Sequence, residues 1–130
     1  MLNYLKSLAL VLALLPGTAF SLGLGEPELL THLNEPLKIV IPVLNANELG
    51  VDDIKAKIAS NQMFEKYDMQ RSYVHSNMQV EVNLDPEGNM YLTILTRELF
   101  KEPFLHVLLD VRWAGGNIFK EITLLLDMPR

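Results

Sequence analysis

The chain contains no cysteine among its 130 residues. This absence excludes a disulfide framework, a thiolate metal site and a cysteine nucleophile. Basic residues are also few, because 11 Lys and Arg stand against 16 Asp and Glu, for a formal net charge of -5. An acidic balance argues against a nucleic-acid-binding protein, which would carry an excess of basic residues. The length fits one ordinary domain, or one domain with a targeting segment, and excludes a TIM barrel or a two-domain dinucleotide enzyme.

Sequence patterns typical of enzymes are missing as well. The chain has no GxSxG, no Walker glycine loop, no HExxH and no GxGxxG. Its three histidines, His32, His75 and His106, lack metal-ligand spacing, so a zinc site would need the fold to bring them together. The adjacent carboxylates Asp52 and Asp53 are more typical of a solvated turn than of an acid/base pair. We therefore predict no enzymatic activity, no metal and no cofactor.

A long apolar run is lacking too, but a short one lies at the N-terminus. Lys6 precedes an apolar run over residues 8–15, which a Pro-Gly pair ends. Ala19 and Ser21 then place small residues three positions and one position before Leu22, as at a signal-peptidase site. A membrane-spanning helix needs about 20 apolar residues, so an uncleaved anchor is the less favoured alternative.

This pattern divides the chain into two parts. Residues 1–21 are predicted to be a signal peptide that is cleaved before Leu22, and residues 22–130 to be the exported domain. No later apolar run is long enough to span a bilayer, so we expect the exported part to be periplasmic and to contain no transmembrane helix.

From Leu22 onward, apolar and polar residues alternate with a period of two, which is typical of half-buried strands. One alternating segment is followed by a second across the turn Asp85–Asn89, with inward positions at Met78, Val80, Val82, Leu84, Met90, Leu92 and Ile94. Pro86 and Gly88 favour a tight turn there, because they supply a fixed and a positive φ respectively. The pattern predicts a β-hairpin.

The same alternation predicts a second hairpin near the end of the chain. Its inward residues are Leu105, Val107, Leu109, Val111 and Trp113, then Ile118, Ile122, Leu124 and Leu126 after the turn Ala114–Asn117. His106, Asp110 and Arg112 should point outward. Trp113 is predicted to be a core residue between two sheets.

Earlier segments show weaker signals. Strands are predicted at 28–33 and 37–43 with a corner at 34–36, and Pro42 predicts an edge position or a bulge, because proline cannot donate to a ladder. Residues 54–58 alternate like a further strand, and a helix over 51–59 is the alternative. Ser60 is placed to cap a short helix that carries Met63, Phe64 and Tyr67 on one side.

The count is about seven short strands with turn signals between them and one short helix. We therefore predict a mainly β domain, an immunoglobulin-like antiparallel β-sandwich.

Three segments then carry a resemblance to a known family. They are the LGLGE opening at 22–26, the LNEPL corner at 33–37, and the final hairpin with EPFL at 102–105, Trp113 and LLLD at 124–127. In this order and spacing they resemble the N-terminal periplasmic domain of the FimV/HubP family, bacterial inner-membrane proteins of type IV pilus assembly and cell-pole organisation.

The resemblance implies a non-enzymatic periplasmic interaction domain of an envelope scaffold, with a role in type IV pilus or secretin assembly, motility or cell-pole organisation. It implies secretin or pilus assembly components as partners, and peptidoglycan through a LysM module that these 130 residues do not contain. It also implies that the chain is part of a longer inner-membrane protein. The alternatives are a stand-alone periplasmic domain that binds a carbohydrate or peptide, and a pilus-chaperone-like module.

The segment from Tyr67 to Asn77 interrupts the strand pattern and is the predicted contact surface. It contains Tyr67, Arg71, Tyr73 and His75, and exposed tyrosines often anchor interfaces. The alternative is that this segment crosses the end of the sandwich and has only a structural role.

Overall fold

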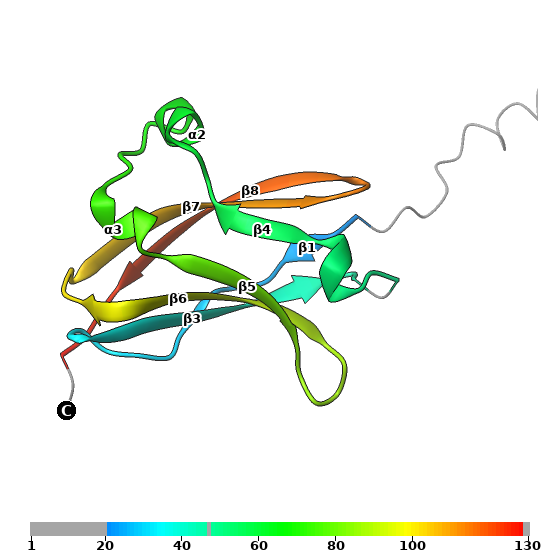
Figure 1. The fold of residues 1–130 in the computed structure, drawn as a ribbon, viewed down its shortest axis with the longest axis horizontal. Coiled ribbons are helices and arrows are strands. Elements are labelled where there is room, and N and C mark those ends of the chain that lie inside the picture. The colour runs from blue at the N-terminus through cyan, green and yellow to red at the C-terminus, as the bar shows by residue number, and fades with distance from the viewer. Residues whose placement is uncertain (1–20, 47, 129–130) are drawn as a thin grey trace, which may run out of the picture.

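The computed structural model describes residues 21–46 and 48–128, which form two stacked antiparallel sheets (Figure 1). In the first sheet the order is β1-β3-β6-β5, and β2 also pairs with β3. Its strands are β1 (Gly23–Leu24), β2 (Glu28–Leu29), β3 (Glu35–Leu44), β5 (Gln79–Leu84) and β6 (Met90–Phe100). The second sheet has the order β4-β7-β8, with β4 (Lys55–Ile58), β7 (Phe104–Trp113) and β8 (Gly116–Leu125).

This arrangement confirms the predicted antiparallel β-sandwich. The described residues contain eight strands rather than about seven, because the N-terminal segment forms two very short strands, β1 and β2, along the same neighbour. Three short helical segments complete the fold: the 3-10 turn η1 (Val51–Asp53), α2 (Asn61–Lys66) and α3 (Tyr73–Ser76). Residues 1–20 of the predicted signal peptide lie outside the described residues.

The first predicted hairpin is β5–β6, and its turn has the expected chemistry. Gly88 has a φ of 85°, and the Asp85 N–H donates to the Asn89 carbonyl at 2.8 Å. The Asp85 carboxylate accepts from the backbone N–H groups of Asn89 and Glu87, and these bonds lower the pKa of that carboxyl. Leu84 departs from the prediction, since it lies beside the turn and is 52% exposed.

The second predicted hairpin is β7–β8, which pairs without interruption from Phe104 with Leu125 to Trp113 with Gly116. The turn is therefore shorter than predicted, because Gly116 and Asn117 belong to β8. Trp113 is half-buried and not enclosed between the sheets, because it is the last residue of its strand. A Cβ atom on Gly115 would lie 2.8 Å from the Trp113 Nε1, so glycine leaves room for the indole over the turn.

The prediction that Pro42 lies at an edge or a bulge is wrong. β3 is an interior strand, Pro42 pairs in register with Tyr91, and the irregularity in this ladder lies between Pro36 and Lys38. The Pro42 carbonyl accepts from the Gly25 N–H at 2.8 Å. In a strand, the N and C=O of one residue point the same way, so the missing N–H faces the break between β1 and β2 and costs no bond to β6.

The segment before the first long strand also differs from the prediction. Only Glu28–Leu29 of the predicted strand 28–33 is paired. The predicted corner is confirmed at Asn34, which has a φ of 66° and donates its N–H to the Phe100 carbonyl at 2.9 Å. Asparagine tolerates this left-handed conformation better than most residues, so the chain reverses there into β3.

The structure decides between the strand and the helix that were predicted as alternatives within residues 51–59. Lys55–Ile58 is the strand β4, and only η1 before it is helical. Asp53 belongs to this turn, because its carboxylate accepts from the Gly50 N–H at 2.6 Å. The Ser60 hydroxyl accepts from the Met63 N–H at 3.4 Å and so caps α2, as predicted.

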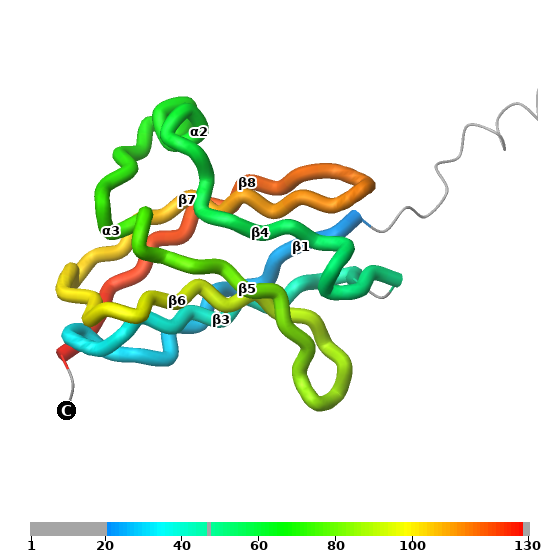
Figure 2. Tube along the Cα trace, viewed as in Figure 1, coloured from blue at the N-terminus to red at the C-terminus, as the bar shows by residue number. Residues whose placement is uncertain are grey.

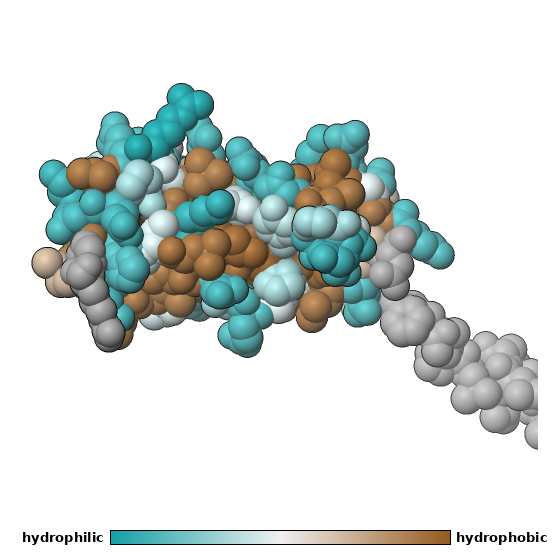
Figure 3. Space-filling model, turned by 90° about the horizontal axis from the view of Figure 1, so that it is seen from below, coloured by the Kyte–Doolittle hydropathy of each residue, from teal (hydrophilic) through white to brown (hydrophobic). Residues whose placement is uncertain are grey.

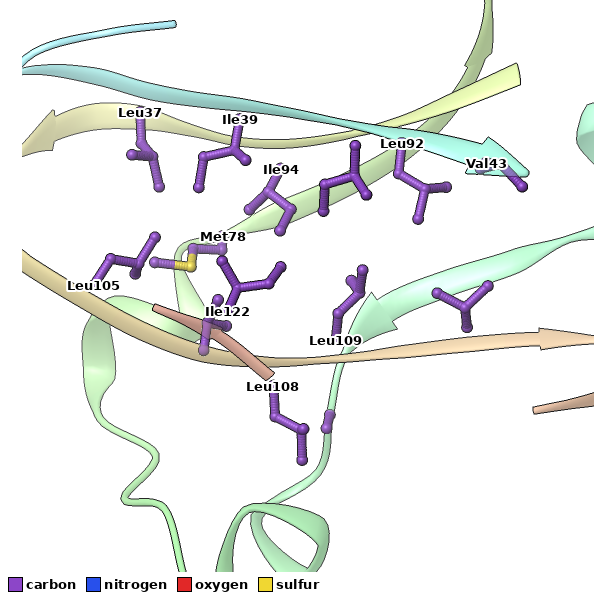
Figure 4. Packing of buried hydrophobic residues seen from close by; sticks show 14 of the residues in the cluster. Leu37, Ile39, Val43, Met78, Leu92, Ile94, Leu105, Leu108, Leu109 and Ile122 are labelled. Carbon is purple, nitrogen blue, oxygen red and sulfur yellow. The ribbon is translucent and has the colours of Figure 1, made fainter. Parts of the chain in front are cut away.

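The core lies between the sheets and is built from their inner faces (Figure 4). Side chains with an exposed fraction of 0% include Ile39 and Ile41 from β3, Ile94 from β6, and Val107 and Leu109 from β7. The buried hydrophobic residues of the described chain all lie from Leu22 to Leu126. This stretch therefore contains a hydrophobic core of its own, as expected of a domain that folds independently.

The two glycines of the LGLGE opening give a matched test of this packing. A Cβ atom on Gly25 would lie 3.1 Å from the Pro42 Cγ, whereas one on Gly23 would meet the Leu44 Cβ at an ordinary 3.6 Å. We predict that Gly25→Ala lowers the free energy of unfolding by about 1–3 kcal/mol, because the rigid proline ring has to move.

Gly23→Ala should stay within about 0.5 kcal/mol of the wild type, as is usual for a substitution without such a clash. Urea denaturation of the two variants checks both values. Equal stabilities would show that the contact between Gly25 and Pro42 does not fix the N-terminal segment.

Candidate interaction surface

The chain between β4 and β5 leaves the sandwich and crosses the outer face of the second sheet (Figures 1 and 2). We call residues 59–78, which include α2 and α3, the excursion. Its start is fixed by the Ala59 N–H, which donates to the Leu108 carbonyl at 2.9 Å. Phe64 of α2 is 0% exposed, and Leu108 points toward this side while Leu109 points into the core (Figure 4). The excursion therefore buries a second apolar layer on β7.

His75 is the polar anchor of the excursion. Its Nδ1 accepts from the Ser72 N–H at 3.0 Å, and its Nε2 lies 2.8 Å from the carbonyl oxygen of His106 on β7. Because a carbonyl only accepts, Nε2 carries the proton, and Nδ1 can accept from Ser72 only while the ring is neutral. The imidazole is 5% exposed, and its centroid lies 5.0 Å from that of the Phe64 ring. The structure thus places His75 in the interior.

Arg71 also holds the excursion together. Its Nε donates to the Ala59 carbonyl at 3.2 Å, and its Nη1 donates to the Ser76 hydroxyl at 3.1 Å. These bonds join the beginning of the excursion to α3, so the side chain has a structural role. Tyr67 lies against Phe119 of β8, with ring centroids 5.9 Å apart, and is 40% exposed.

Tyr73 is the residue of the predicted contact surface that projects most into solvent. It is 75% exposed on α3 and borders a depression of about 230 Å³. Leu99 and Lys101, which also line this depression, come from the end of β6 and the connection that follows. Leu99 is itself 55% exposed. The structure therefore places an aromatic and an aliphatic side chain together on the surface of this end of the sandwich.

A second surface lies on the outer face of the first sheet, which no helix of the described chain covers (Figure 1). It is a shallow groove of about 640 Å³ over β3, β6 and β5. Thr93, 3% exposed, is the most enclosed of its outward residues, and Val40, Tyr91 and Leu95 surround it. Figure 3 shows hydrophobic surface on this face, bordered by hydrophilic side chains.

Sequence reasoning missed this groove and one buried charge. Val40, Tyr91 and Leu95 occupy outward positions of the alternating pattern, and apolar residues at such positions were the available signal. Asp110 lies on the outer face of β7, as predicted, but is only 2% exposed there. Asn117 donates to its carboxylate at 2.7 Å and Arg112 at 3.2 Å, so the hairpin satisfies the charge that it buries.

The structure does not bring the three histidines together. The His32 ring lies 3.1 Å from Glu35, and the His106 ring lies 2.6 Å from Glu121. Within residues 21–46 and 48–128 no group of three or more metal-ligating side chains is present. No helix in the same residues is long and apolar enough to cross a membrane.

His75 gives a prediction for the pH dependence of stability. Burial lowers its pKa below the ordinary value of 6.5, and the nearby charge of Arg71 acts in the same direction, although the hydrogen bond to His106 opposes them. Well above pH 6.5 both folded and unfolded chains carry a neutral ring, so this group does not affect the free energy of unfolding there. As the pH falls below that value the unfolded chain binds the proton first, and the folded state loses stability.

We therefore expect the free energy of unfolding to decrease on acidification below pH 6.5 and to level off once the folded protein is protonated too. Replacing the ring by an amide in His75→Gln should remove this part of the pH dependence. Urea denaturation of both proteins across this range measures it. An identical acid response of the two proteins would contradict a neutral buried His75.

Comparison with known proteins supplies the family. The model of the FimV N-terminal Ig-like domain matches residues 22–129. Two relatives called motility hub protein FimV, from Pseudomonas aeruginosa strains PAO1 and UCBPP-PA14, are each 32% identical over 124 residues. No solved structure matches the chain.

These alignments cover 95% of this chain but only 14% and 13% of the two relatives. The chain thus spans only a small part of the length of these two relatives, although almost all of the chain is aligned with them. With the two-sheet sandwich and the family match over residues 22–129, the chain belongs to the FimV N-terminal Ig-like domain family.

Proposed function

We propose that this chain is a periplasmic, non-enzymatic interaction domain of an envelope scaffold that serves type IV pilus or secretin assembly, motility or cell-pole organisation. The observation that carries the proposal is the match to a motility hub protein over 95% of the chain. A hub acts by contact, and the exposed Tyr73 end of the sandwich is a surface of the kind that contacts use. The partners proposed are secretin or pilus assembly components, and peptidoglycan through a LysM module elsewhere in a longer protein.

The proposed location depends on export through the N-terminal segment. The charged start, the apolar run over 8–15 and the small residues Ala19 and Ser21 support cleavage before Leu22. Mass spectrometry of the protein from a periplasmic fraction is expected to find Leu22 as the first residue. Recovery of the uncleaved chain from the cytoplasm would overturn this location.

The contact surface is proposed to include the exposed part of the excursion. Removal of this domain from the longer scaffold should impair pilus-dependent motility without lowering the amount of scaffold. Tyr73→Ala should reduce motility and leave the melting temperature unchanged, since a side chain that is 75% exposed contributes little to the core. Arg71→Ala should instead lower the melting temperature, because it breaks the bonds to Ala59 and Ser76.

A tyrosine on the opposite sheet serves as the matched control. Tyr91 lies in the groove of the first sheet, whereas the excursion covers the second sheet, and Tyr91→Ala should leave motility intact. Motility lost in Tyr91→Ala but retained in Tyr73→Ala would move the contact surface to the groove. Motility retained in both variants would remove both tyrosines from the proposal.

The groove supports a second candidate function, a periplasmic domain that binds a carbohydrate or peptide. Tyr91 could stack on a sugar ring, and Asn83, Asp85 and Asn89 place hydrogen-bonding groups along the same groove. Binding of a chito-oligosaccharide that Tyr91→Ala abolishes would favour this function.

A further inference from the structure

β8 is a long sheet edge that the described chain leaves open along the strand itself. Two residues beyond the strand, the Asp127 carbonyl on the same edge accepts from the Leu33 N–H at 2.8 Å. In the sheet order β4-β7-β8 its one strand neighbour is β7, and the ladder between them runs for ten residue pairs. β8 contains no proline and no bulge, and it follows the rim of the second sheet (Figure 1). Natural proteins usually interrupt or cover such an edge, because its free backbone groups can pair with another chain.

The other edges of the sandwich lack this property. β1 and β2 have two residues each, and Pro27 interrupts the segment between them. β4 and β5 have only four and six residues, and they lie side by side across the gap between the sheets (Figures 1 and 2), where both line a depression of about 360 Å³. Within residues 21–46 and 48–128, β8 is therefore the one long edge that could accept a further strand.

The hydrogen bonds define which backbone groups of β8 face outward. The Leu126 N–H donates to the Pro103 carbonyl at 2.8 Å, in register with the β7–β8 ladder. Even-numbered residues of β8 therefore point their N–H and C=O groups toward β7, and odd-numbered residues point them toward the open edge. The outward residues are Asn117, Phe119, Glu121, Thr123 and Leu125, and none of them has another backbone hydrogen bond among the described residues.

The charges of β8 argue against a second copy of this chain as the occupant. Two β8 strands related by a twofold axis would pair antiparallel, and the registers that use most of the strand are centred on residue 120 or 121. The first places Lys120 opposite its own copy, and the second does the same for Glu121. Like charges directly opposite each other destabilise a strand pair.

The side chains of β8 specify a different occupant. Ile122 and Leu124 face the first sheet, so the inward side of an added strand would need apolar residues beside them. Lys120 belongs to the same inward row, opposite the buried Leu109, and has no ion-pair partner among the described residues. An inward lysine at an edge weakens the binding of a strand that has no carboxylate opposite it, and so it makes the edge selective for its partner.

We propose that β8 binds an extended segment of a partner protein as a fourth strand of the second sheet. The segment alternates apolar with polar residues and carries one acidic side chain in its apolar row, opposite Lys120. Its backbone pairs with the outward groups of residues 117, 119, 121, 123 and 125. This inference deepens the proposed interaction role and rests on it, but its test is made by binding alone.

The probe is a short capped peptide that alternates threonine and valine, with one central valine replaced by glutamate. Amide hydrogen exchange of the chain, followed by NMR, reports where the peptide binds. We expect the amides of Phe119, Glu121 and Thr123 to exchange at least roughly tenfold more slowly with the peptide bound, because added hydrogen bonds protect them. The same peptide with lysine in place of glutamate should bind more weakly, since it faces Lys120.

Thr123→Pro and Thr123→Ala form the decisive pair of variants. Proline removes one outward N–H, which an edge strand tolerates, and should weaken peptide binding by roughly tenfold. Alanine keeps the N–H and should preserve binding. If Thr123→Pro does not fold, a peptide that is N-methylated on its β8-facing residues tests the same bonds with the wild-type chain.

Three results would overturn the proposal: no binding of the glutamate peptide, protection at another edge, or equal binding by the proline and alanine variants. These binding results do not depend on whether Tyr73→Ala changes motility. Failure of strand addition and failure of the proposed motility role are therefore distinguishable.

Discussion

Strand β7 is buried on both of its faces, and most other features of the structure follow from this constraint. Val107, Leu109 and Val111 face the core between the sheets, while Leu108 and Asp110 are buried on the outer face. One sheet packed on another covers only one of these faces. The excursion covers the other face of β7. It begins where β4 ends after four residues, and its Phe64 is buried against the outer face of the second sheet.

A strand enclosed in this way has to satisfy its polar groups internally, because a buried group without a partner costs about 1–3 kcal/mol. The outer face of β7 meets this requirement with side chains from elsewhere in the fold. His75 donates to the His106 carbonyl, and Asn117 and Arg112 donate to Asp110. The neutral state of His75 is thus tied to the packing of Phe64 and Leu108.

The parts of the fold that sequence could predict are those with local signals. Alternation identified the β5–β6 and β7–β8 hairpins, Gly88 identified a turn, and Ser60 identified the start of α2. Trp113 and Pro42 were misjudged, because their settings depend on neighbours that are distant or not visible in the pattern. The indole covers its own turn, and the proline nitrogen faces the break between β1 and β2.

The predicted contact surface shows the same limit. Its four residues lie within nine positions of sequence, but the fold gives them different tasks: Tyr73 is exposed, Tyr67 packs on Phe119, and Arg71 and His75 hold the excursion. The sequence pattern identified the segment that leaves the sandwich. It could not separate these tasks, because they depend on bonds to Ala59 and His106, which belong to other elements.

The cover over β7 also determines which surfaces are left for contact. The excursion occupies the outer face of the second sheet, so the uncovered regions include the Tyr73 end, the groove of the first sheet and the edge of β8. The first two present side chains, whereas β8 presents backbone groups, which any extended chain could pair with. Selectivity at that edge must therefore come from side chains, and Lys120 is the β8 residue that brings a charge into the inward row.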